Sequence, residues 1–191
     1  LLQFAYMGAF YMQHRYNMKQ KARVALLNNG EEESKGTDLQ KQTYALLKEA
    51  DAEGRIRFVG NLEARDMQSG RADVVVADGF SGNMVLKTAE GVAEFMVDAI
   101  KDVFMKNPAT KVAAMMVKGG LKDLKKKMDY REIGGTPLLG ISKPVLKAHG
   151  SSNAKAVCNA IGQARDFAEQ HVVNEIEANI EYMKISGVGT K

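Results

Sequence analysis

A run of valines leads into a glycine-containing turn and then a long helix-like pattern. This junction constrains the fold of the chain more than any other segment. The run is Val74 to Val76, and the turn reads Ala77-Asp78-Gly79-Phe80-Ser81-Gly82-Asn83. Glycine lets a backbone approach a ligand closely, and the first N–H groups of a helix have no partner within the helix. The segment therefore predicts a strand, a ligand-binding loop and a helix in succession.

Apolar spacing elsewhere predicts helices and strands that alternate. Expected strands cover residues 24–27, 56–59 and 73–77, and expected helices cover 2–16, 38–50, 62–69, 83–105, 109–128, 153–169 and 172–183. Thr37 followed by Gln40 resembles a capping box, and Gly54 follows the last turn of the helix that this box would begin. The alternation indicates βαβ units, and so the α/β fold class.

The two longest expected helices are consecutive. Asn107 and Pro108 end the first, and the second returns from there. We therefore expect a helical hairpin at about residues 95–130 that projects from the body of the fold. Met115, Met116, Leu121 and Lys122 combine apolar and basic character, which suits either an anionic membrane surface or the second subunit of a dimer. Aromatic residues are not interleaved with these lysines, so nucleic-acid binding is disfavoured.

Composition excludes several classes of protein. The chain has 191 residues, 45% of them hydrophobic, and a formal net charge of +4, which suits one large or two small globular domains. A single cysteine excludes an internal disulfide and fits a reducing cytoplasm. No apolar run approaches the roughly 20 residues of a membrane-spanning helix. Residues 1–12 lack an initiator methionine and the features of a signal peptide, so we expect a piece of a longer protein.

Two further loops follow expected strands and resemble the first in their small and polar residues. One contains Asn29, Gly30 and Glu31 within an acidic run, and the other runs from Lys147 to Asn153. Loops at the same edge of a parallel sheet converge, so we expect the three loops to line one crevice. The alternative for the acidic run is a solvated turn whose acids cap the next helix.

The turn after Val76 also has two interpretations. Asp78 or Ser81 would cap the following helix in the structural one. In the functional one, Gly79, Gly82 and Asn83 contact a phosphate or a carbonyl oxygen, and Lys87 supplies positive charge one turn further on. Neither the G-x-G-x-x-G pattern nor the P-loop consensus is present, which weakens any nucleotide-binding hypothesis.

The histidines and the cysteine differ in what they indicate. His149 is the best candidate for chemistry because it follows an expected strand, although a structural role stays open; His14 and His171 are expected at the surface. Cys158 lies in an apolar helical pattern and is expected to be a buried, inert thiol. The spacing of histidine and cysteine predicts no metal site, and we expect no cofactor.

Four motifs together resemble the phosphate acyltransferase family of bacterial phospholipid synthesis. They span residues 28–36, 58–66, 72–87 and 147–153, and begin with Asn-Asn-Gly-Glu-Glu-Glu, Phe-Val-Gly-Asn-Leu-Glu, Ala-Asp-Val-Val-Val and Lys-Ala-His-Gly-Ser-Ser-Asn respectively. The resemblance implies that acyl-acyl carrier protein and inorganic phosphate are converted to acyl phosphate and free carrier protein. It also implies a three-layer α/β/α sandwich like that of isocitrate dehydrogenase and phosphotransacetylase. The family is typically homodimeric, cytoplasmic and peripheral to the membrane, and a glycerol-3-phosphate acyltransferase uses the product.

The resemblance extends over nearly all of residues 1–191, which would be the C-terminal portion of one acyltransferase domain whose N-terminal half is absent. It suggests catalytic roles for Lys87, His149, Asn153 and Asp78. Substrate or phosphate binding would fall to Asn29, Gly30, Glu31, Gly79, Gly82, Asn83, Lys147, Gly150 and Ser151. Two alternatives stay open: a phosphate acetyl- or butyryltransferase that uses coenzyme A, and a non-catalytic membrane-associated scaffold.

Overall fold

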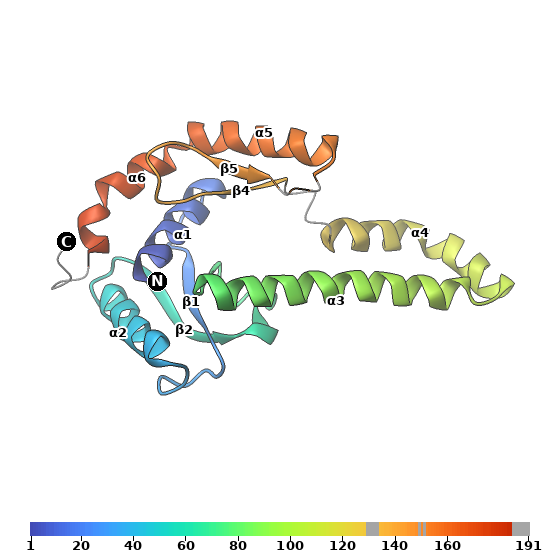
Figure 1. Ribbon diagram of the computed structural model, residues 1–191, viewed down its shortest axis with the longest axis horizontal. Helices are drawn as coiled ribbons and strands as arrows, with labels where there is room; N and C mark the ends of the chain where they lie inside the picture. The colour runs from blue at the N-terminus through green and yellow to red at the C-terminus, as the bar shows by residue number, and fades with distance from the viewer. Residues whose placement is uncertain (129–133, 149, 151, 185–191) are drawn as a thin grey trace. The chain divides into compact units, whose positions relative to one another are not determined.

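The computed structural model describes residues 1–128, 134–148, 150 and 152–184, with the backbone alone for residues 125–128 (Figure 1). The elements in chain order are α1 (Leu2–Arg15), β1 (Arg23–Asn28), α2 (Asp38–Ala52), β2 (Arg57–Glu63), η1 (Ala64–Asp66), β3 (Val74–Val76), α3 (Gly79–Met105), α4 (Pro108–Met128), β4 (Gly135–Pro137), β5 (Leu146–Ala148), α5 (Ala154–Glu169), α6 (Val172–Ala178) and η3 (Ile180–Met183).

The chain divides into two compact units. Unit 1 contains residues 1–82, 137–146 and 164–191, and unit 2 contains residues 83–136 and 147–163. The division falls within the first turns of α3, so the glycine-containing turn belongs to unit 1 and most of the helix belongs to unit 2.

Unit 1 is built on a three-stranded parallel sheet in the order β2-β1-β3. Val24 and Leu26 in the central strand are fully buried, and so is Ala25, which points to the other face. A parallel sheet covered on both faces explains why β1 is apolar throughout and does not alternate. The predicted α/β class is therefore confirmed for this unit.

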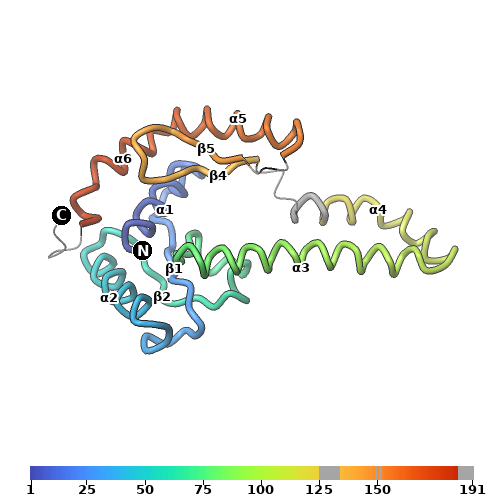
Figure 2. Tube along the Cα trace, in the orientation of Figure 1, coloured from blue at the N-terminus to red at the C-terminus, as the bar shows by residue number. Residues whose placement is uncertain are grey.

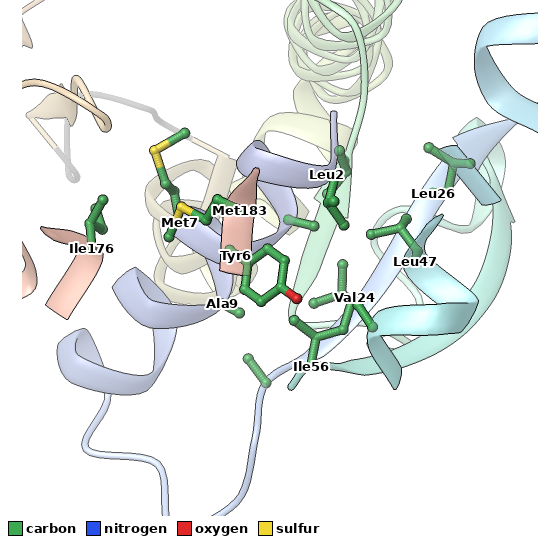
Figure 3. Close-up of a cluster of buried hydrophobic side chains, with 14 of the residues drawn as sticks. Leu2, Tyr6, Met7, Ala9, Val24, Leu26, Leu47, Ile56, Ile176 and Met183 are labelled. Atoms are coloured by element: carbon green, nitrogen blue, oxygen red, sulfur yellow. The ribbon is translucent and has the colours of Figure 1, made fainter. Parts of the chain in front are cut away.

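One hydrophobic core joins the sheet to its helices. Figure 3 shows Leu2 and Tyr6 of α1, Val24 and Leu26 of β1, and Leu47 of α2 around the same buried space. The core also includes Val172, Ile176 and Met183, so the C-terminal helices α6 and η3 pack onto it. Segments far apart in sequence thus form a single unit around α1.

Most of the predicted elements agree with the structure to within a few residues. The capping box is confirmed: the Thr37 N–H donates to Gln40 Oε1 at 3.2 Å, and both halves of the motif are present at the start of α2. Gly54 follows α2 with a φ of +66°, a left-handed conformation that favours glycine.

The prediction of a helix at residues 62–69 is wrong. Leu62 continues strand β2 and pairs with Leu27 of β1, and only residues 64–66 form one short 3₁₀ turn. Leu62 is 2% exposed. Pairing with the buried central strand therefore outweighs the weak local preference for helix in this segment.

The apolar run at Val145 and Leu146 also departs from expectation. Strand β5 pairs with β4 in a separate two-stranded sheet, whereas we expected it to end at the edge of the parallel sheet. Two of the three expected loops therefore leave one common sheet, and the third follows another.

Unit 2 contains α4, most of α3 and the larger part of α5. The chain reverses direction between α3 and α4, which are joined by Lys106 and Asn107 (Figure 2). Asn107 Oδ1 accepts a hydrogen bond from the Thr110 N–H at 2.9 Å, so Asn107 caps α4. That this pair of helices projects from the rest of the protein stays a prediction.

Cys158 corrects another expectation. Its side chain on α5 is exposed, not buried. The neighbouring Ala156 and Ala160 face inward instead. Each residue of an α-helix is rotated by about 100° from the one before it, so the inward face of α5 misses the cysteine between these two alanines.

An ion pair joins the first residue of β1 to the residue before β3. Arg23 donates to Asp73 through Nε at 3.0 Å and Nη2 at 2.8 Å, and the Arg23 N–H donates to the same carboxylate at 2.8 Å. The hydrogen bonds from the Arg23 side chain hold the pKa of Asp73 below its ordinary value. Because the folded pKa is lowered, this stabilisation is present above about pH 4 and is lost as the pH falls through the folded pKa.

We expect Asp73→Asn to reduce the free energy of unfolding at pH 7 by about 1.5–3 kcal/mol, because charge-assisted hydrogen bonds are lost. The difference from the unmodified protein should shrink as the pH falls below about 4. Urea unfolding at several pH values measures both effects. Glu181→Gln, which removes the exposed pair with Lys184, is the control and should have almost no effect. A difference that is constant with pH would contradict the assignment to the Asp73 carboxylate.

Candidate functional site

The carboxyl ends of two neighbouring strands place two of the predicted loops at one edge of the unit 1 sheet. Strand β1 ends at Asn28 and β3 ends at Val76, and the two strands are parallel and directly paired. Such an edge is the usual ligand-binding side of an α/β sheet. The loop at residues 29–37 and the turn at Asp78 therefore start from adjacent positions.

The loop between β1 and α2 is compact and held by its own hydrogen bonds. Asn28 Nδ2 donates to the Lys35 carbonyl at 3.2 Å, and the Lys35 N–H donates to the Glu32 carbonyl at 3.1 Å. Gly36 has a φ of +85°, and a Cβ there would lie 2.5 Å from Asn28 Oδ1. Asn29, Gly30 and Glu31 thus occupy a defined turn.

Two of the three consecutive acids in this loop are held by cations. Glu33 accepts hydrogen bonds from Lys48 Nζ at 2.8 Å and from the Tyr44 hydroxyl at 3.1 Å, and the bond from Lys48 is the main cause of its lowered pKa. Glu31 pairs with Arg71, whose hydrogen bond lowers the pKa of Glu31. The α2 helix is capped by Thr37, so the interpretation of these acids as helix caps is wrong.

Asp78 is the N-cap of α3. Its Oδ1 accepts hydrogen bonds from the Ser81 N–H at 2.8 Å and the Phe80 N–H at 3.0 Å, and its carbonyl accepts one from the Gly82 N–H at 2.9 Å. The backbone hydrogen bond from Ser81 is the largest cause of the lowered pKa of Asp78. The structural interpretation of Asp78 as a cap is therefore correct, which leaves its proposed chemical role open.

These bonds limit how the turn could hold an anion. The N–H groups of Phe80, Ser81 and Gly82 are already engaged by Asp78, so a bound oxygen at this turn would rely mainly on nearby side chains. Gly82 also permits close packing, because a Cβ there would lie 3.2 Å from the Ala77 Cβ. At Gly79, by contrast, nothing lies within 4 Å of the position that a Cβ would take, so Gly82 is the glycine whose size matters for the turn.

A pair of substitutions separates the cap from the charge at Asp78. We expect Asp78→Ala to lower the melting temperature by about 2–6 °C, and Asp78→Asn by no more than about 1 °C, because asparagine is also a good N-cap. Thermal unfolding and turnover of the full-length protein are measured together. Equal melting temperatures for both variants would contradict the cap, and turnover lost in both would assign the charge to the chemistry.

In unit 2, Asn83 and Lys87 lie four residues apart on α3, a spacing that places them on the same side of the helix. Lys87 Nζ lies 2.9 Å from Glu90 Oε2, and both side chains are exposed. An exposed ion pair of this kind contributes little to stability.

The predicted residues after β5 are described only in part. Lys147 lies within β5, and Asn153 caps α5 by accepting a hydrogen bond from the Ala156 N–H at 2.9 Å. Gly150 lies in a turn, and beyond its chain neighbours no described atom lies within 4 Å of the position that a Cβ would take. His149 and Ser151 lie outside the described residues, so their predicted roles stay predictions.

Helices α3 and α4 carry a large apolar surface. Every residue of α3 is described and none is buried; Phe95 is 70% exposed. Met115 and Met116 on α4 are 68% and 84% exposed, whereas Leu121 lines an apolar groove of about 250 Å³ together with α3 residues such as Val97 and Phe104. Of the four residues expected to contact lipid or a dimer partner, Leu121 therefore faces its neighbouring helix.

A membrane-spanning helix and a metal site each place requirements on the residues that the structure describes. No helix there combines the length and apolar character needed to cross a lipid bilayer. The same ranges contain no group of three or more histidine, cysteine, aspartate or glutamate residues placed to hold a metal ion.

Comparison with known proteins places this chain in a family. The family model described as fatty acid synthesis protein matches residues 1–175. This chain belongs to the fatty acid synthesis protein family. Proteins named phosphate acyltransferase are 48% identical in Lysinibacillus sphaericus over 97% of the chain, and 50% identical in Oceanobacillus iheyensis over 95% of it. A third, from Thermoanaerobacter pseudethanolicus, is 46% identical over 96% of the chain.

The chain spans only part of these relatives, 54%, 53% and 54% of their respective lengths. The four motifs of the sequence resemble those of phosphate acyltransferases, and these comparisons confirm that resemblance. The enzyme named in these relatives is a phosphate acyltransferase.

Sequence reasoning missed two side chains that the structure brings to the loops. Arg71, which pairs with Glu31, lies 40 positions away from it. Asn61 was part of a recognised motif, yet no role was given to it; its Nδ2 donates to the Glu32 carbonyl at 2.9 Å. A buried asparagine in a strand is unusual, and that polar residue in an apolar run was the signal available in the sequence.

Proposed function

We propose that the protein to which this chain belongs transfers an acyl group from acyl-acyl carrier protein to inorganic phosphate. The products are acyl phosphate and free carrier protein, and the pathway is bacterial phospholipid synthesis. The observation that carries the proposal is the 46–50% identity, over nearly the whole chain, to proteins named phosphate acyltransferase. The placement of two motif loops at one sheet edge supports it.

The reaction needs few chemical groups. A phosphate oxygen attacks the thioester carbonyl carbon, an oxyanion forms, the C–S bond breaks and the thiolate leaves with its electron pair. A thiol with a pKa of about 8.5 is a good leaving group, so little acid assistance is required. Positioning and stabilisation of the oxyanion should supply most of the rate enhancement.

We assign the phosphate and the developing oxyanion to Lys87 and Asn83, which share one side of α3. His149 and Asn153 would orient the acyl donor or protonate the departing thiolate, with Lys147, Gly150 and Ser151 as neighbours. Glu31, with Asn29 and Gly30, and Asp78, with Gly79 and Gly82, would shape the pocket. The hydrogen bonds of Glu31 and Asp78 suit an organising role better than direct contact with phosphate, because carboxylates repel it.

The remaining parts of the proposal concern the setting of the enzyme. We infer a homodimer with the three-layer α/β/α architecture, peripheral to the cytoplasmic face of the membrane, whose product a glycerol-3-phosphate acyltransferase consumes. The exposed apolar side chains of Met115 and Met116 support contact with an anionic membrane or a second subunit.

Flotation with anionic vesicles, compared between the full-length protein and Met116→Glu, tests the lipid contact. Unchanged flotation of the variant would leave the dimer as the function of this surface.

The deciding experiment incubates the full-length protein with palmitoyl-acyl carrier protein, with and without inorganic phosphate. We expect acyl phosphate, detected by mass spectrometry, only when phosphate is present. A parallel reaction with palmitoyl-coenzyme A tests the related transferase class, and faster product formation from that donor would favour it. No product from either donor with folded protein would refute the proposal.

A further inference from the structure

Asn61 has an environment that stability alone does not explain. It is 4% exposed, near the carboxyl end of β2, and its Nδ2 donates to the Glu32 carbonyl at 2.9 Å. Its Oδ1 is buried and accepts no hydrogen bond from any residue that the structure describes. An unsatisfied buried acceptor is unfavourable, so an apolar residue of similar shape would serve a purely structural purpose at least as well.

A β-bulge aims this side chain. Val24 pairs with Phe58 and Leu26 pairs with Asn61, so β2 contains one residue more than β1 between these pairs. An extra residue sends every later side chain to the opposite face, which puts Asn61 on the same face as Phe58. Phe58 packs on Tyr44 of α2 with ring centroids 5.1 Å apart, so this is the face next to the β1–α2 loop.

Gly60 makes the bulge possible. Its φ is +92°, a conformation that glycine adopts readily and other residues do not. Nothing lies within 4 Å of the position that a Cβ would take, so the requirement for glycine here comes from the backbone conformation and not from crowding. Gly60 and Asn61 therefore act together: the bulge at Gly60 directs the Asn61 amide towards the β1–α2 loop.

The bond from Asn61 fixes the centre of the acidic loop. The Glu32 carbonyl accepts both Asn61 Nδ2 and the Lys35 N–H, while the flanking acids are held by other groups, Glu31 by Arg71 and Glu33 by Lys48. The pairs of Glu31 and Glu33 are exposed, and such pairs hold a loop only weakly. The Asn61 bond is part-buried, which makes it the firmer restraint.

We propose that Asn61 is a positioning residue, which sets the place of Glu31 at the proposed substrate site through its hydrogen bond to the Glu32 carbonyl. The inference rests on the proposed function for its consequence in catalysis. Its structural part, the restraint of residues 29–37, stands independently of any activity.

The structural part is tested by hydrogen exchange of the full-length protein. Asn61→Leu removes both polar groups, and Asn61→Asp keeps an acceptor but loses the donor. We expect amide exchange in residues 29–37 to rise by roughly threefold to tenfold in both variants. The control is Asn179→Leu, because Asn179 Nδ2 makes a bond of the same kind and length, 2.9 Å to the Glu175 carbonyl, at the end of α6. Exchange in the loop unchanged by Asn61→Leu, or raised equally by the control, would overturn the proposal.

The catalytic part is tested by a double-mutant cycle. We expect Asn61→Leu to lower kcat/KM by about tenfold or more with little change in melting temperature, whereas Asn179→Leu leaves kcat/KM unchanged. The double variant Asn61→Leu/Glu31→Gln should lose little more kcat/KM than either single variant, because both substitutions act through Glu31. Fully additive losses, or a Glu31→Gln variant with unchanged activity beside an impaired Asn61→Leu, would overturn action through Glu31. If the unmodified protein makes no acyl phosphate, the proposed function fails, and the exchange experiment alone decides the restraint.

Discussion

Gly134→Ala is expected to destabilise unit 2 strongly, although it adds only one methyl group. A Cβ at this position would lie 2.6 Å from the Ala160 backbone nitrogen and 2.7 Å from the Ala156 carbonyl oxygen of α5. These are backbone atoms, so relief requires movement of the helix itself. Gly134 also has a φ of +91°, which adds a cost of about 1–2 kcal/mol for alanine. We expect a total loss of roughly 3–5 kcal/mol in the free energy of unfolding.

Urea unfolding of the full-length protein measures this loss, and hydrogen exchange in residues 154–163 locates it in α5. The matched control is Gly162→Ala on α5, where no atom outside the neighbouring backbone of the helix lies within 4 Å of the new Cβ. That change should stabilise by about 0.5–1 kcal/mol, because alanine favours helix. A Gly134→Ala variant as stable as the unmodified protein would show that the close approach to α5 is absent in solution.

Lys87→Ala is expected to have the largest effect on activity. If the Lys87 ammonium stabilises the phosphate and the oxyanion, its removal should lower turnover by at least about tenfold without unfolding the protein. The exposed position of Lys87 on α3 supports the second expectation, since substitutions on an exposed helix surface rarely change stability by much.

Two controls separate this role from general effects of charge. Lys101→Ala removes another exposed lysine of α3 and should leave turnover nearly unchanged. Glu90→Gln removes the pair between Lys87 Nζ and Glu90 Oε2 at 2.9 Å and should change turnover by no more than about threefold, because that pair is exposed and weak. Full activity in Lys87→Ala would remove Lys87 from the site and shift the phosphate to other residues.

The order of elements follows from local patterns. The apolar run of β1 predicts a buried strand, Thr37 and Gln40 set the start of α2, and the valines before Asp78 predict β3. Each of these signals depends on residues that are close in sequence, so the sequence alone is enough to predict these elements. Asp78 belongs to the same group, because its cap depends only on the two to four residues that follow it.

Pairing over long sequence distances decided the rest. Where a helix was expected from residue 62, strand β2 continues to Glu63, because Leu62 pairs with Leu27 across the sheet. Strand β5 joins β4 and leaves the parallel sheet, since strand pairing depends on what the whole chain places nearby. The partner of Glu31 was invisible for the same reason, with 40 positions between it and Arg71.

The sequence by itself determined the family, the α/β class and the loops that carry the polar side chains, because turn chemistry and hydrophobic period are local properties. Only the tertiary structure decided which of those side chains restrain a loop and which remain available to a ligand. Asn61 illustrates the difference: its place in a motif was readable, but a bulge at Gly60 determines the face it occupies, and the register against β1 determines the carbonyl it holds. Register is a relation between strands, and no single segment encodes it.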